Sequence, residues 1–504
     1  MEEIKIDLQY KGELFKPIWK KLITAGRANE GLRAEWREQL SKIQQEIGFE
    51  YIRFHGVFHE DMMVYHEDEN GKPMYNWQYI DSLLDFLHSV NLRPIMELSF
   101  TPYDMQSGDK TVFWWKGNIT PPKDYEKWSM LVGAFVKHCI NRYGKKEVLS
   151  WYFEVWNEPN LKLFWSGTQE EYFELYRVTA EAIKQIDTDM KVGGPASSGS
   201  VDGSPPWVED FLNYCRSNSV PVDFVSTHPY PNTYPIGSDG NQREGYRDEN
   251  GTYNSLIWLK DIMNNCGYID TEVHITEWNA SPNDRDLIHD TMYMAPFIIQ
   301  NNIKCLGLAD SLGFWAFTDI FEERGAGRSI FHGGFGLINA QGLEKPSYNG
   351  YWFLSRLGCE KLYSGKNYIV TRKEDKIQIL MWNYCHFNAA FSDGVRTGLS
   401  DYDRYSVFES KEDKNLKFII ENLEGRYKAV TYVNDRENGS VFDSWVANGT
   451  AENPDTDDLA VLKANMKPKG SICYFENTDS YERDITIKPH GVVLIELSRV
   501  SKFT

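Results

Sequence analysis

The sequence predicts an α/β fold: a (β/α)8 TIM barrel followed by a C-terminal antiparallel β-sandwich. Three observations lead to this prediction: eight short β-rich segments, helix-patterned segments between them, and a change to short, turn-separated strands after about residue 355. The predicted barrel covers residues 14–345 and the sandwich covers residues 355–504. The first ten residues alternate apolar and polar side chains, so we expect a strand within residues 1–13 that joins the sandwich.

The predicted barrel strands are rich in β-branched and aromatic residues. They cover residues 21–25, 50–55, 92–99, 148–156, 190–195, 222–228, 272–277 and 311–318. Apolar residues recur at helical spacing in the segments between them, for example in residues 33–46, 78–90, 124–144 and 169–187. An open doubly wound sheet is the alternative, but no glycine-rich phosphate-binding turn follows an early strand. The alternation therefore favours a closed parallel barrel.

The C-terminal strands are short and are separated by turn-rich stretches such as EDK, NDRENGS and ENPDTDD. They cover residues 367–372, 376–384, 416–421, 427–433, 471–475, 482–488 and 491–498. This spacing is typical of an antiparallel sandwich.

The net charge and the composition limit the classes of molecule that the protein is expected to bind. The formal net charge of −19 repels nucleic acid and anionic lipid, so we expect a neutral small molecule or polymer as the partner. The sequence contains no apolar run long enough to cross a membrane. Its first residues, MEEIKIDLQYKGE, lack the apolar core of a secretory signal. Seven scattered cysteines without a CxxC motif predict buried thiols in a reducing compartment, and we expect a cytoplasmic protein.

Aromatic residues make up 14% of the chain, with 16 Trp, 29 Tyr and 27 Phe. Many are expected in the core, such as Phe135, Tyr172 and Phe353. Others fall at strand ends or in the loops beyond them, where their flat faces can stack on the apolar ring face of a ligand. Those we expect to contact a ligand are Trp114, Tyr230 and Trp315, with Trp165 and Trp278 as further candidates.

Two glutamates fall at the ends of predicted barrel strands, where the active groups of such barrels lie. Glu158 follows the fourth strand in WNEPN, and Glu277 ends the seventh in ITEWN. Paired carboxylates at one barrel mouth suit glycosidic-bond cleavage, in which one acid donates a proton and one carboxylate attacks the anomeric carbon. Asn157 and Glu158 point to opposite faces of a regular strand, so both reach the site only if the strand end bends.

At these residues the chain resembles clan A glycoside hydrolases and, within them, family 39, the β-xylosidases. The motifs that carry the resemblance span the barrel region: YIRFHG (51–56), TVFWWKGNITPPKDYEKW (111–128), WYFEVWNEPNLKLFW (151–165), VPVDFVSTHPY (220–230), ITEWN (275–279) and FHGGFGL (331–337). The resemblance is weaker over the last 150 residues, where only the accessory sandwich of the family is implied.

The resemblance implies roles for these residues. Glu158 is implied as general acid/base and Glu277 as nucleophile. Asn157 resembles the asparagine that binds the sugar 2-hydroxyl, and Tyr230 the tyrosine that hydrogen-bonds the nucleophile.

The resemblance also implies a sugar-binding pocket around the two glutamates. His55 and His228 resemble sugar-contacting histidines, although each also fits a histidine satisfied in the core. Trp315 resembles the aromatic floor of the subsite, and Glu322 and Glu323 resemble an acidic pair that grips the non-reducing-end hydroxyls.

A tryptophan pair in the loop after the third strand, Trp114 and Trp115, either packs that loop onto the barrel or walls the sugar pocket. We expect one of the two to form the wall and take Trp114 as the candidate.

We therefore expect a retaining exo-glycosidase that releases xylose from xylo-oligosaccharides through a covalent glycosyl-enzyme. The alternatives keep the mechanism with another sugar, as in an α-L-arabinosidase, a β-glucosidase or β-galactosidase, or an α-L-iduronidase. A carbohydrate-binding relative without catalysis is a further alternative, against which both intact glutamates argue. The chemistry requires no metal and no organic cofactor. Family members are often tetramers, so the resemblance alone implies a homo-oligomer.

Overall fold

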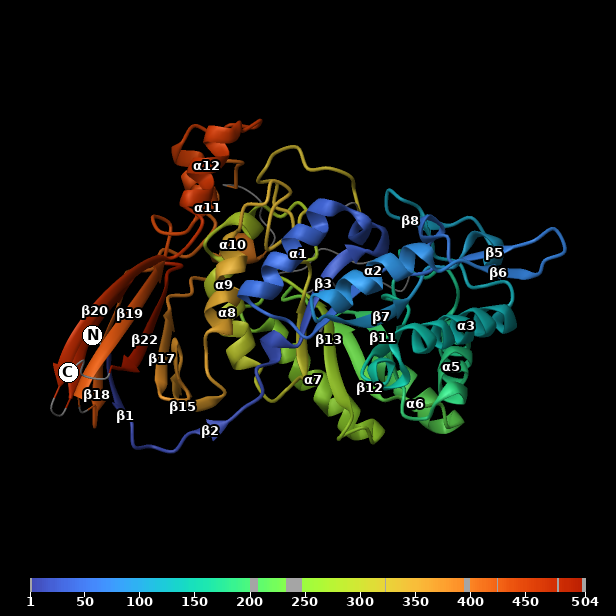
Figure 1. The fold of residues 1–504 in the computed structure, drawn as a ribbon, viewed down its shortest axis with the longest axis horizontal. Coiled ribbons are helices and arrows are strands. Elements are labelled where there is room, and N and C mark those ends of the chain that lie inside the picture. Colours follow the sequence, from blue (N-terminus) through green and yellow to red (C-terminus); the bar gives the residue numbers. More distant parts are fainter. Residues whose placement is uncertain are drawn as a thin grey trace. The chain divides into compact units, whose positions relative to one another are not determined.

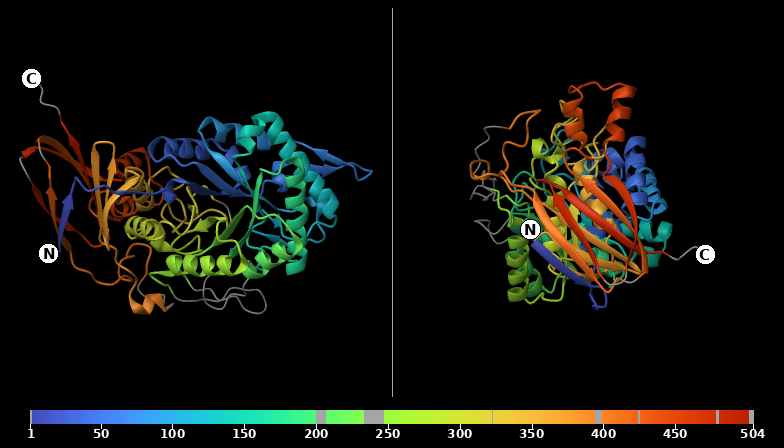
Figure 2. Two further views of the ribbon diagram at one scale, coloured as in Figure 1. Left: turned by 90° about the horizontal axis from the view of Figure 1, so that it is seen from below. Right: turned by 90° about the vertical axis from the view of Figure 1, so that its left-hand side faces the viewer.

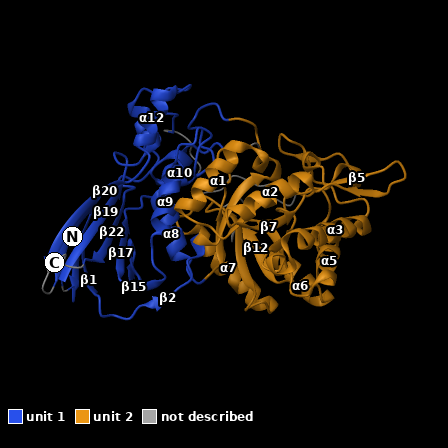
Figure 3. Cartoon of the chain, viewed as in Figure 1, with its two compact units in different colours: residues 1–19, 283–307, 327–504 blue, residues 20–282, 308–326 orange. Residues whose placement is uncertain are grey.

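The structure, a computed structural model, describes residues 2–199, 207–232, 247–321, 323–393, 399–423, 425–477 and 480–500. Figure 1 shows its helices and strands in chain order. The chain divides into two compact units, coloured separately in Figure 3. We call residues 20–282 with 308–326 the barrel unit, and residues 1–19, 283–307 and 327–504 the sandwich unit.

Eight parallel strands of the barrel unit close into a barrel, in the order β10-β11-β12-β13-β14-β3-β4-β7. Their bounds are β3 Leu22–Arg27, β4 Tyr51–His55, β7 Arg93–Leu98, β10 Tyr152–Val155, β11 Lys191–Ser198, β12 Phe224–His228, β13 Glu272–Trp278 and β14 Ser311–Phe314. Nearly every strand residue is buried, as expected for parallel strands covered on both faces. The predicted parallel barrel is confirmed.

Helices follow the barrel strands along the chain. They are α1 Ala34–Glu46, α2 Gln78–Ser89, α3 Tyr125–Tyr143, α4 Lys145–Val148, α5 Gln169–Ile186, α6 Trp207–Asn218 and α7 Gly251–Cys266. The four predicted helices end within one residue of these bounds, and the termini of α3 and α5 carry strong signals. Asp124 caps α3 by accepting from two backbone amides, and Thr168 and Glu171 form a capping box at α5. Gly144, with φ of 86°, ends α3.

The fourth barrel strand is shorter than predicted. We expected residues 148–156, but Lys145–Val148 form helix α4 and the strand covers only Tyr152–Val155. It stops there because Trp156 has a φ of 73°, outside the range of a regular strand. The predicted strand 311–318 likewise ends early, at Phe314.

Short elements lie in the loops of both units. The strands are β2 Glu13–Leu14, β5 Tyr65–Glu67, β6 Pro73–Tyr75, β8 Thr111–Val112 and β9 Gly117–Asn118. The 3-10 helices are η1 Ile18–Lys20, η2 Ala28–Leu32, η3 Glu60–Met62, η4 Tyr103–Met105 and η5 Leu287–Asp290. The β8–β9 hairpin contains the Trp114–Trp115 pair in its turn.

The sandwich unit contains two sheets, with orders β2-β15-β16-β17-β22-β19-β20 and β1-β18-β21. The right-hand view of Figure 2 shows the orange and red strands of the larger sheet side by side. The remaining bounds are β1 Glu2–Asp7, β15 Glu360–Gly365, β16 Tyr368–Lys373, β17 Lys376–Trp382, β18 Lys414–Glu421, β19 Gly425–Asn434, β20 Lys469–Asn477, β21 Tyr481–Ile487 and β22 Val492–Arg499.

One apolar core joins the two sheets, with residues such as Ile4, Met381, Phe418 and Leu497 buried together. The predicted sandwich is therefore confirmed. Its pairing is not wholly antiparallel, because β1 pairs in parallel with β18.

The sandwich unit also contains helices that the sequence analysis did not predict there. They are α8 Met294–Lys304, α9 Pro346–Ser355, α10 Ala389–Ser392, α11 Val441–Ala447 and α12 Thr456–Ala464. The polar stretches NDRENGS and ENPDTDD predict turns, but Ser440 and Asp455 in them are N-caps of α11 and α12. The expected domain boundaries, 14–345 and 355–504, stay a prediction.

Composition-based expectations are met in part. Phe135, Tyr172 and Phe353 are fully buried, as expected. All seven cysteines are free, but Cys359 and Cys473 are exposed, so the expectation of buried thiols is wrong for these two. Among the described helices, none has both the length and the apolar composition needed to cross a bilayer.

Candidate active site

The chain turns sharply after β10 and carries Glu158 into the mouth of the barrel. Trp156 and Glu158 have φ values of 73° and 43°, so the strand end bends as the sequence analysis required. The backbone amide of Glu158 donates to the carbonyl of Ala196 on β11, at 2.9 Å. This turn brings both Asn157 and Glu158 into the buried site, where they are 1% and 6% exposed.

Glu277 lies near the end of β13 and is held by two donors. Arg53 Nη1 donates to Glu277 Oε1 at 2.7 Å, and the Tyr230 hydroxyl donates to Oε2 at 3.0 Å. The contact of Tyr230 is the one that the family resemblance implied. Both carboxyl oxygens of Glu277 therefore have fixed positions before any sugar binds.

The two glutamates face each other at a short distance. One carboxyl oxygen of Glu158 and one of Glu277 lie within 4.8 Å of each other, and a ring nitrogen of His228 lies within the same distance of both. Retaining glycosidases hold their carboxyl groups about 5–5.5 Å apart, whereas inverting ones need about 6.5–9.5 Å to admit a water. The observed separation fits the retaining geometry.

Electrostatics separates the protonation states of the pair. Burial raises the pKa of Glu158 well above the usual carboxyl value, and the neighbouring charge of Glu277 raises it further. Burial also raises the pKa of Glu277, but Arg53 and His55 oppose this rise. These effects favour a proton on Glu158 and the ionised form of Glu277.

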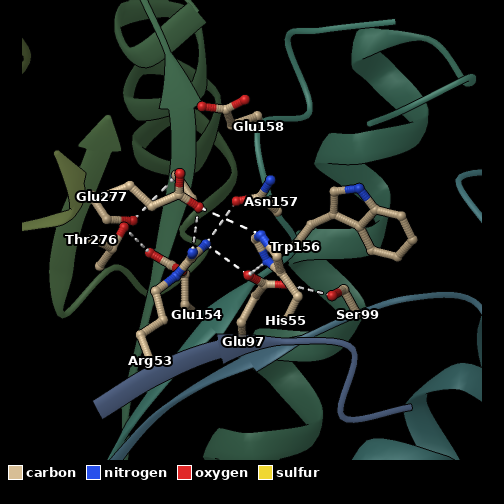
Figure 4. A network of polar contacts seen from close by, with 12 residues as sticks. Arg53, His55, Glu97, Ser99, Glu154, Trp156, Asn157, Glu158, Thr276 and Glu277 are labelled. Carbon is tan, nitrogen blue, oxygen red and sulfur yellow. Dashed lines mark hydrogen bonds and ion pairs between the residues drawn. The ribbon is translucent and has the colours of Figure 1, made fainter. Parts of the chain in front are cut away.

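Arg53 on β4 is the centre of the buried network in Figure 4. Its guanidinium donates to Glu154 at 2.6 Å, to Glu277 at 2.7 Å and to Asn157 at 2.8 Å, and it pairs with Glu97 at 2.7 Å. Four barrel strand ends thus meet at one positive charge. The site takes its positive charge from this guanidinium.

Sequence reasoning missed Arg53, Glu97, Glu154 and Thr276. The signal that finds three of them is a charged residue inside an otherwise apolar strand, as in YIRFH, RPIMEL and YFEV. Such a charge is expensive to bury unless it is paired, so three of them on barrel strands predict one shared cluster.

Both predicted histidines lie in the site. His55 Nδ1 contacts Glu97 Oε2 at 2.6 Å, and its Nε2 lies 3.7 Å from Glu277 Oε1. Ser99 also donates to Glu97, and the charges of His55 and Arg53 hold the pKa of this buried carboxyl below its usual value against the effect of burial. His228 Nδ1 contacts Glu158 Oε1 at 2.9 Å.

Two aromatic rings pack against His55. The ring of Trp315 lies 4.7 Å from that of His55, and Phe113 stacks on His55 at 5.9 Å. Sequence reasoning took neighbouring Trp114 as the wall, but its side chain is 65% exposed, whereas Phe113 makes the ring contact with His55. Trp115 is 9% exposed and packs on Phe113. The assignment of Trp114 to the sugar pocket stays a prediction.

The two further aromatic candidates, Trp165 and Trp278, are both buried. Trp165 is 1% exposed, and its indole donates to the carbonyl of Thr168. Trp278 is fully buried and packs on Phe314. The expectation that they contact a sugar stays a prediction.

The acidic pair after the eighth strand is described in part. Glu322 lies outside the described residues. Glu323 accepts from the backbone amide of Trp114 at 2.9 Å through its carbonyl oxygen. Burial raises the pKa of Tyr230, and the charges of Glu277, Glu158 and Glu323 add to this effect. The carboxyl group of Glu323 is therefore close enough to the site to act on it electrostatically.

Comparison with known proteins identifies the family. A model of the glycosyl hydrolases family 39 matches residues 2–480. A β-xylosidase from Caldicellulosiruptor saccharolyticus is 36% identical over 508 aligned positions, which cover 98% of each chain. A β-xylosidase from Geobacillus stearothermophilus is 41% identical over 379 positions, covering 74% of this chain and 75% of the relative.

Comparison with solved structures agrees with the sequence comparison. The crystal structure of a monomeric β-xylosidase from Caulobacter crescentus superposes with a TM-score of 0.90 and 30% sequence identity. The superposition covers 99% of this chain and 100% of that one. The family model over nearly the whole chain and these relatives agree, and the chain belongs to the glycosyl hydrolases of family 39.

Proposed function

We propose that the protein is a retaining exo-β-xylosidase, with Glu277 as nucleophile and Glu158 as general acid/base. One observation carries the assignment of roles: two buried carboxyl groups lie within 4.8 Å and differ in what surrounds them. Glu277 is bonded to a guanidinium and a phenol, whereas Glu158 faces a histidine. Family 39 membership and two β-xylosidase relatives support xylose as the sugar.

In the first step, Glu277 attacks the anomeric carbon and Glu158 donates its proton to the leaving oxygen. The bond to the leaving group breaks as the glycosyl–Glu277 ester forms. Asn157 Oδ1 is occupied by Arg53, so its amide NH2 is the part that donates to the sugar 2-hydroxyl. A hydrogen bond at that hydroxyl strengthens in the oxocarbenium-like transition state.

In the second step, the ionised Glu158 takes a proton from water, and the resulting hydroxide equivalent attacks the same carbon. The ester to Glu277 breaks and the sugar leaves with its original configuration. Each carboxyl group returns to its starting state, so the cycle needs no external acid or base.

The same mechanism on a uronic acid is the less favoured alternative. A uronate requires a cation with charge to spare near C5 of the ring. Arg53, the guanidinium at the centre of the site, is already committed to Glu97, Glu154 and Glu277. It therefore offers no free charge to a substrate carboxylate.

A screen of nitrophenyl glycosides with NMR detection of the first-formed sugar anomer tests this proposal. We expect turnover of the β-xyloside and initial release of β-xylose. Initial release of α-xylose contradicts the retaining mechanism. A large preference for a glucoside, galactoside, arabinoside or iduronide contradicts the assignment of xylose as the substrate sugar.

We also propose a cytoplasmic site of action, supported by seven free cysteines, two of them exposed. The homo-oligomer is a further proposal that rests on the family resemblance. Sedimentation of the purified chain tests it, since a monomer at micromolar concentration contradicts it.

A further inference from the structure

A chain of four buried side chains runs from the acid/base glutamate into the barrel. Glu158 Oε1 contacts His228 Nδ1 at 2.9 Å, and His228 Nε2 contacts Thr276 Oγ1 at 3.0 Å. The Thr276 hydroxyl contacts Glu154 Oε1 at 2.7 Å, and Glu154 Oε2 accepts from Arg53 at 2.6 Å. Glu154, Thr276 and His228 are at most 1% exposed, so water does not compete for these contacts.

The number of hydrogens on each group fixes which partner donates in each of these hydrogen bonds. Arg53 only donates, and a carboxylate paired with it only accepts, so the Thr276 hydroxyl donates its single hydrogen to Glu154. Thr276 Oγ1 must then accept from His228, which places a hydrogen on Nε2. Burial, with Arg53 and His55 nearby, keeps the pKa of His228 well below its usual value, so the ring is neutral.

A neutral imidazole carries one ring hydrogen, so Nδ1 of His228 is an acceptor. The contact of 2.9 Å with Glu158 then requires the hydrogen to belong to the Glu158 carboxyl group. The reverse direction requires a proton on Glu154, against its ion pair with Arg53. The guanidinium thus selects one of the two directions.

We propose that Glu154, Thr276 and His228 form a hydrogen-bond relay that keeps Glu158 protonated in the resting enzyme. All three are positioning residues for the general acid, and this inference rests on the proposed function. His228, which the family resemblance assigned to the sugar, has both ring nitrogens committed within the protein. After Glu158 gives up its proton, Nδ1 has no hydrogen to offer the carboxylate, which makes Glu158 a stronger base for the second step.

Other charged and polar groups also act on Glu158 and His228. Glu277 on β13 and Glu97 on β7 raise the pKa of Glu158, whereas Arg53 on β4 and Ser198 on β11 lower it. His228 faces the charges of Arg53 and His55 on β4, and its Nδ1 also lies 3.7 Å from Glu277 Oε2. Tyr230, after β12, lies close enough to Glu158 for the two to interact electrostatically. A substitution at Thr276 leaves all of these groups in place, so it isolates the effect of the relay.

The first test compares Thr276→Val with Thr276→Ser. Valine keeps the shape of threonine but removes the hydroxyl, so the ring hydrogen of His228 is free to move to Nδ1 and donate to ionised Glu158. This stabilises the charged form, and the basic limb of the kcat/KM profile moves down by about one pH unit, or about 1.4 kcal/mol. Serine retains the hydroxyl, so we expect the basic limb of Thr276→Ser to lie at the pH of the wild type.

The matched control is Thr24→Val, a fully buried barrel threonine whose hydroxyl donates to the carbonyl of Phe314. It loses one hydrogen bond outside the relay, so we expect its basic limb to match that of the wild type. The substrate is a xyloside with a poor leaving group, which needs the acid. An unmoved limb in Thr276→Val, or an equal shift in Thr24→Val, overturns the proposal.

The second test needs neither turnover nor a folded variant at Thr276. Nitrogen-15 NMR of histidine-labelled wild-type protein reports the tautomer of each ring, and the signals absent from His228→Asn are those of His228. We predict the neutral form with hydrogen on Nε2, and hydrogen on Nδ1 overturns the relay. Absent xylosidase activity with the Nε2 tautomer present contradicts the proposed function but leaves the relay standing.

Discussion

Replacing Arg53 with methionine removes the positive charge shared by three buried carboxylates. Methionine keeps most of the volume, so the main effect is electrostatic. Breaking a buried ionic cluster by removing one partner costs about 3–5 kcal/mol of folding free energy. Arg53 is fully buried and bonded to Glu97, Glu154 and Glu277, so we expect a loss at the upper end of that range.

The same substitution also changes the nucleophile. A hydrogen bond to a charged group contributes about 1.5–3 kcal/mol, which corresponds to about 1–2 pH units. Arg53 opposes the rise in the pKa of Glu277 that burial causes, so its removal raises that pKa. Glu277 attacks only when ionised, and the acidic limb of the kcat/KM profile therefore moves to higher pH.

Two assays check this prediction: urea unfolding for stability, and the pH profile with an activated aryl xyloside whose leaving group needs no acid. The control is Arg93→Met, which removes a half-exposed partner of Glu147 from β7 and is expected to cost less than about 1 kcal/mol. An Arg53→Met variant as stable as Arg93→Met, with an unmoved acidic limb, refutes the reasoning.

Three further predictions concern single carboxyl groups. Glu277→Ala nearly abolishes turnover, and azide restores it with α-xylosyl azide as product; normal activity without azide contradicts the role. Glu158→Ala slows xylosides with poor leaving groups far more than activated aryl xylosides, and equal losses for both contradict an acid role. In the sandwich unit, burial raises the pKa of Asp290, but Lys345 and Arg404 lower it to about 2. Asp290 thus adds about 2 kcal/mol to the free energy of unfolding above pH 4, and this contribution is lost as the pH falls from 4 to 2. We expect Asp290→Asn to remove this pH dependence between pH 4 and pH 2. An acid unfolding curve unchanged by the substitution contradicts the prediction.

The sequence predicts the barrel and the meeting of Glu158 and Glu277 at one buried site, because both follow from local patterns. Helices α3 and α5 carry caps and an apolar face, and their predicted ends are correct within one residue. Glu158 and Glu277 fall at strand ends, and Pro159 indicates where the strand stops. The bend between Asn157 and Glu158 follows from requiring both side chains in one site.

The supporting network is harder to predict, because each of its members depends on partners from other strands. Arg53 acquires its role from carboxylates on β7, β10 and β13, which the sequence does not place in register. The family resemblance assigns His228 to the sugar, and only the positions of Glu158 and Thr276 show that its two ring nitrogens are occupied. Trp165 and Trp278 fall near strand ends like the other aromatic candidates, but both side chains are buried.

The most direct test of the central claim is to trap the covalent intermediate. An activated aryl 2-deoxy-2-fluoro-β-xyloside slows both steps through its fluorine, while its good leaving group restores the rate of the first step. We predict one fluoroxylosyl adduct per chain by intact mass, located by peptide fragmentation on Glu277. An adduct on Glu158, or turnover of the natural β-xyloside with no trapped adduct on any carboxylate, contradicts the account.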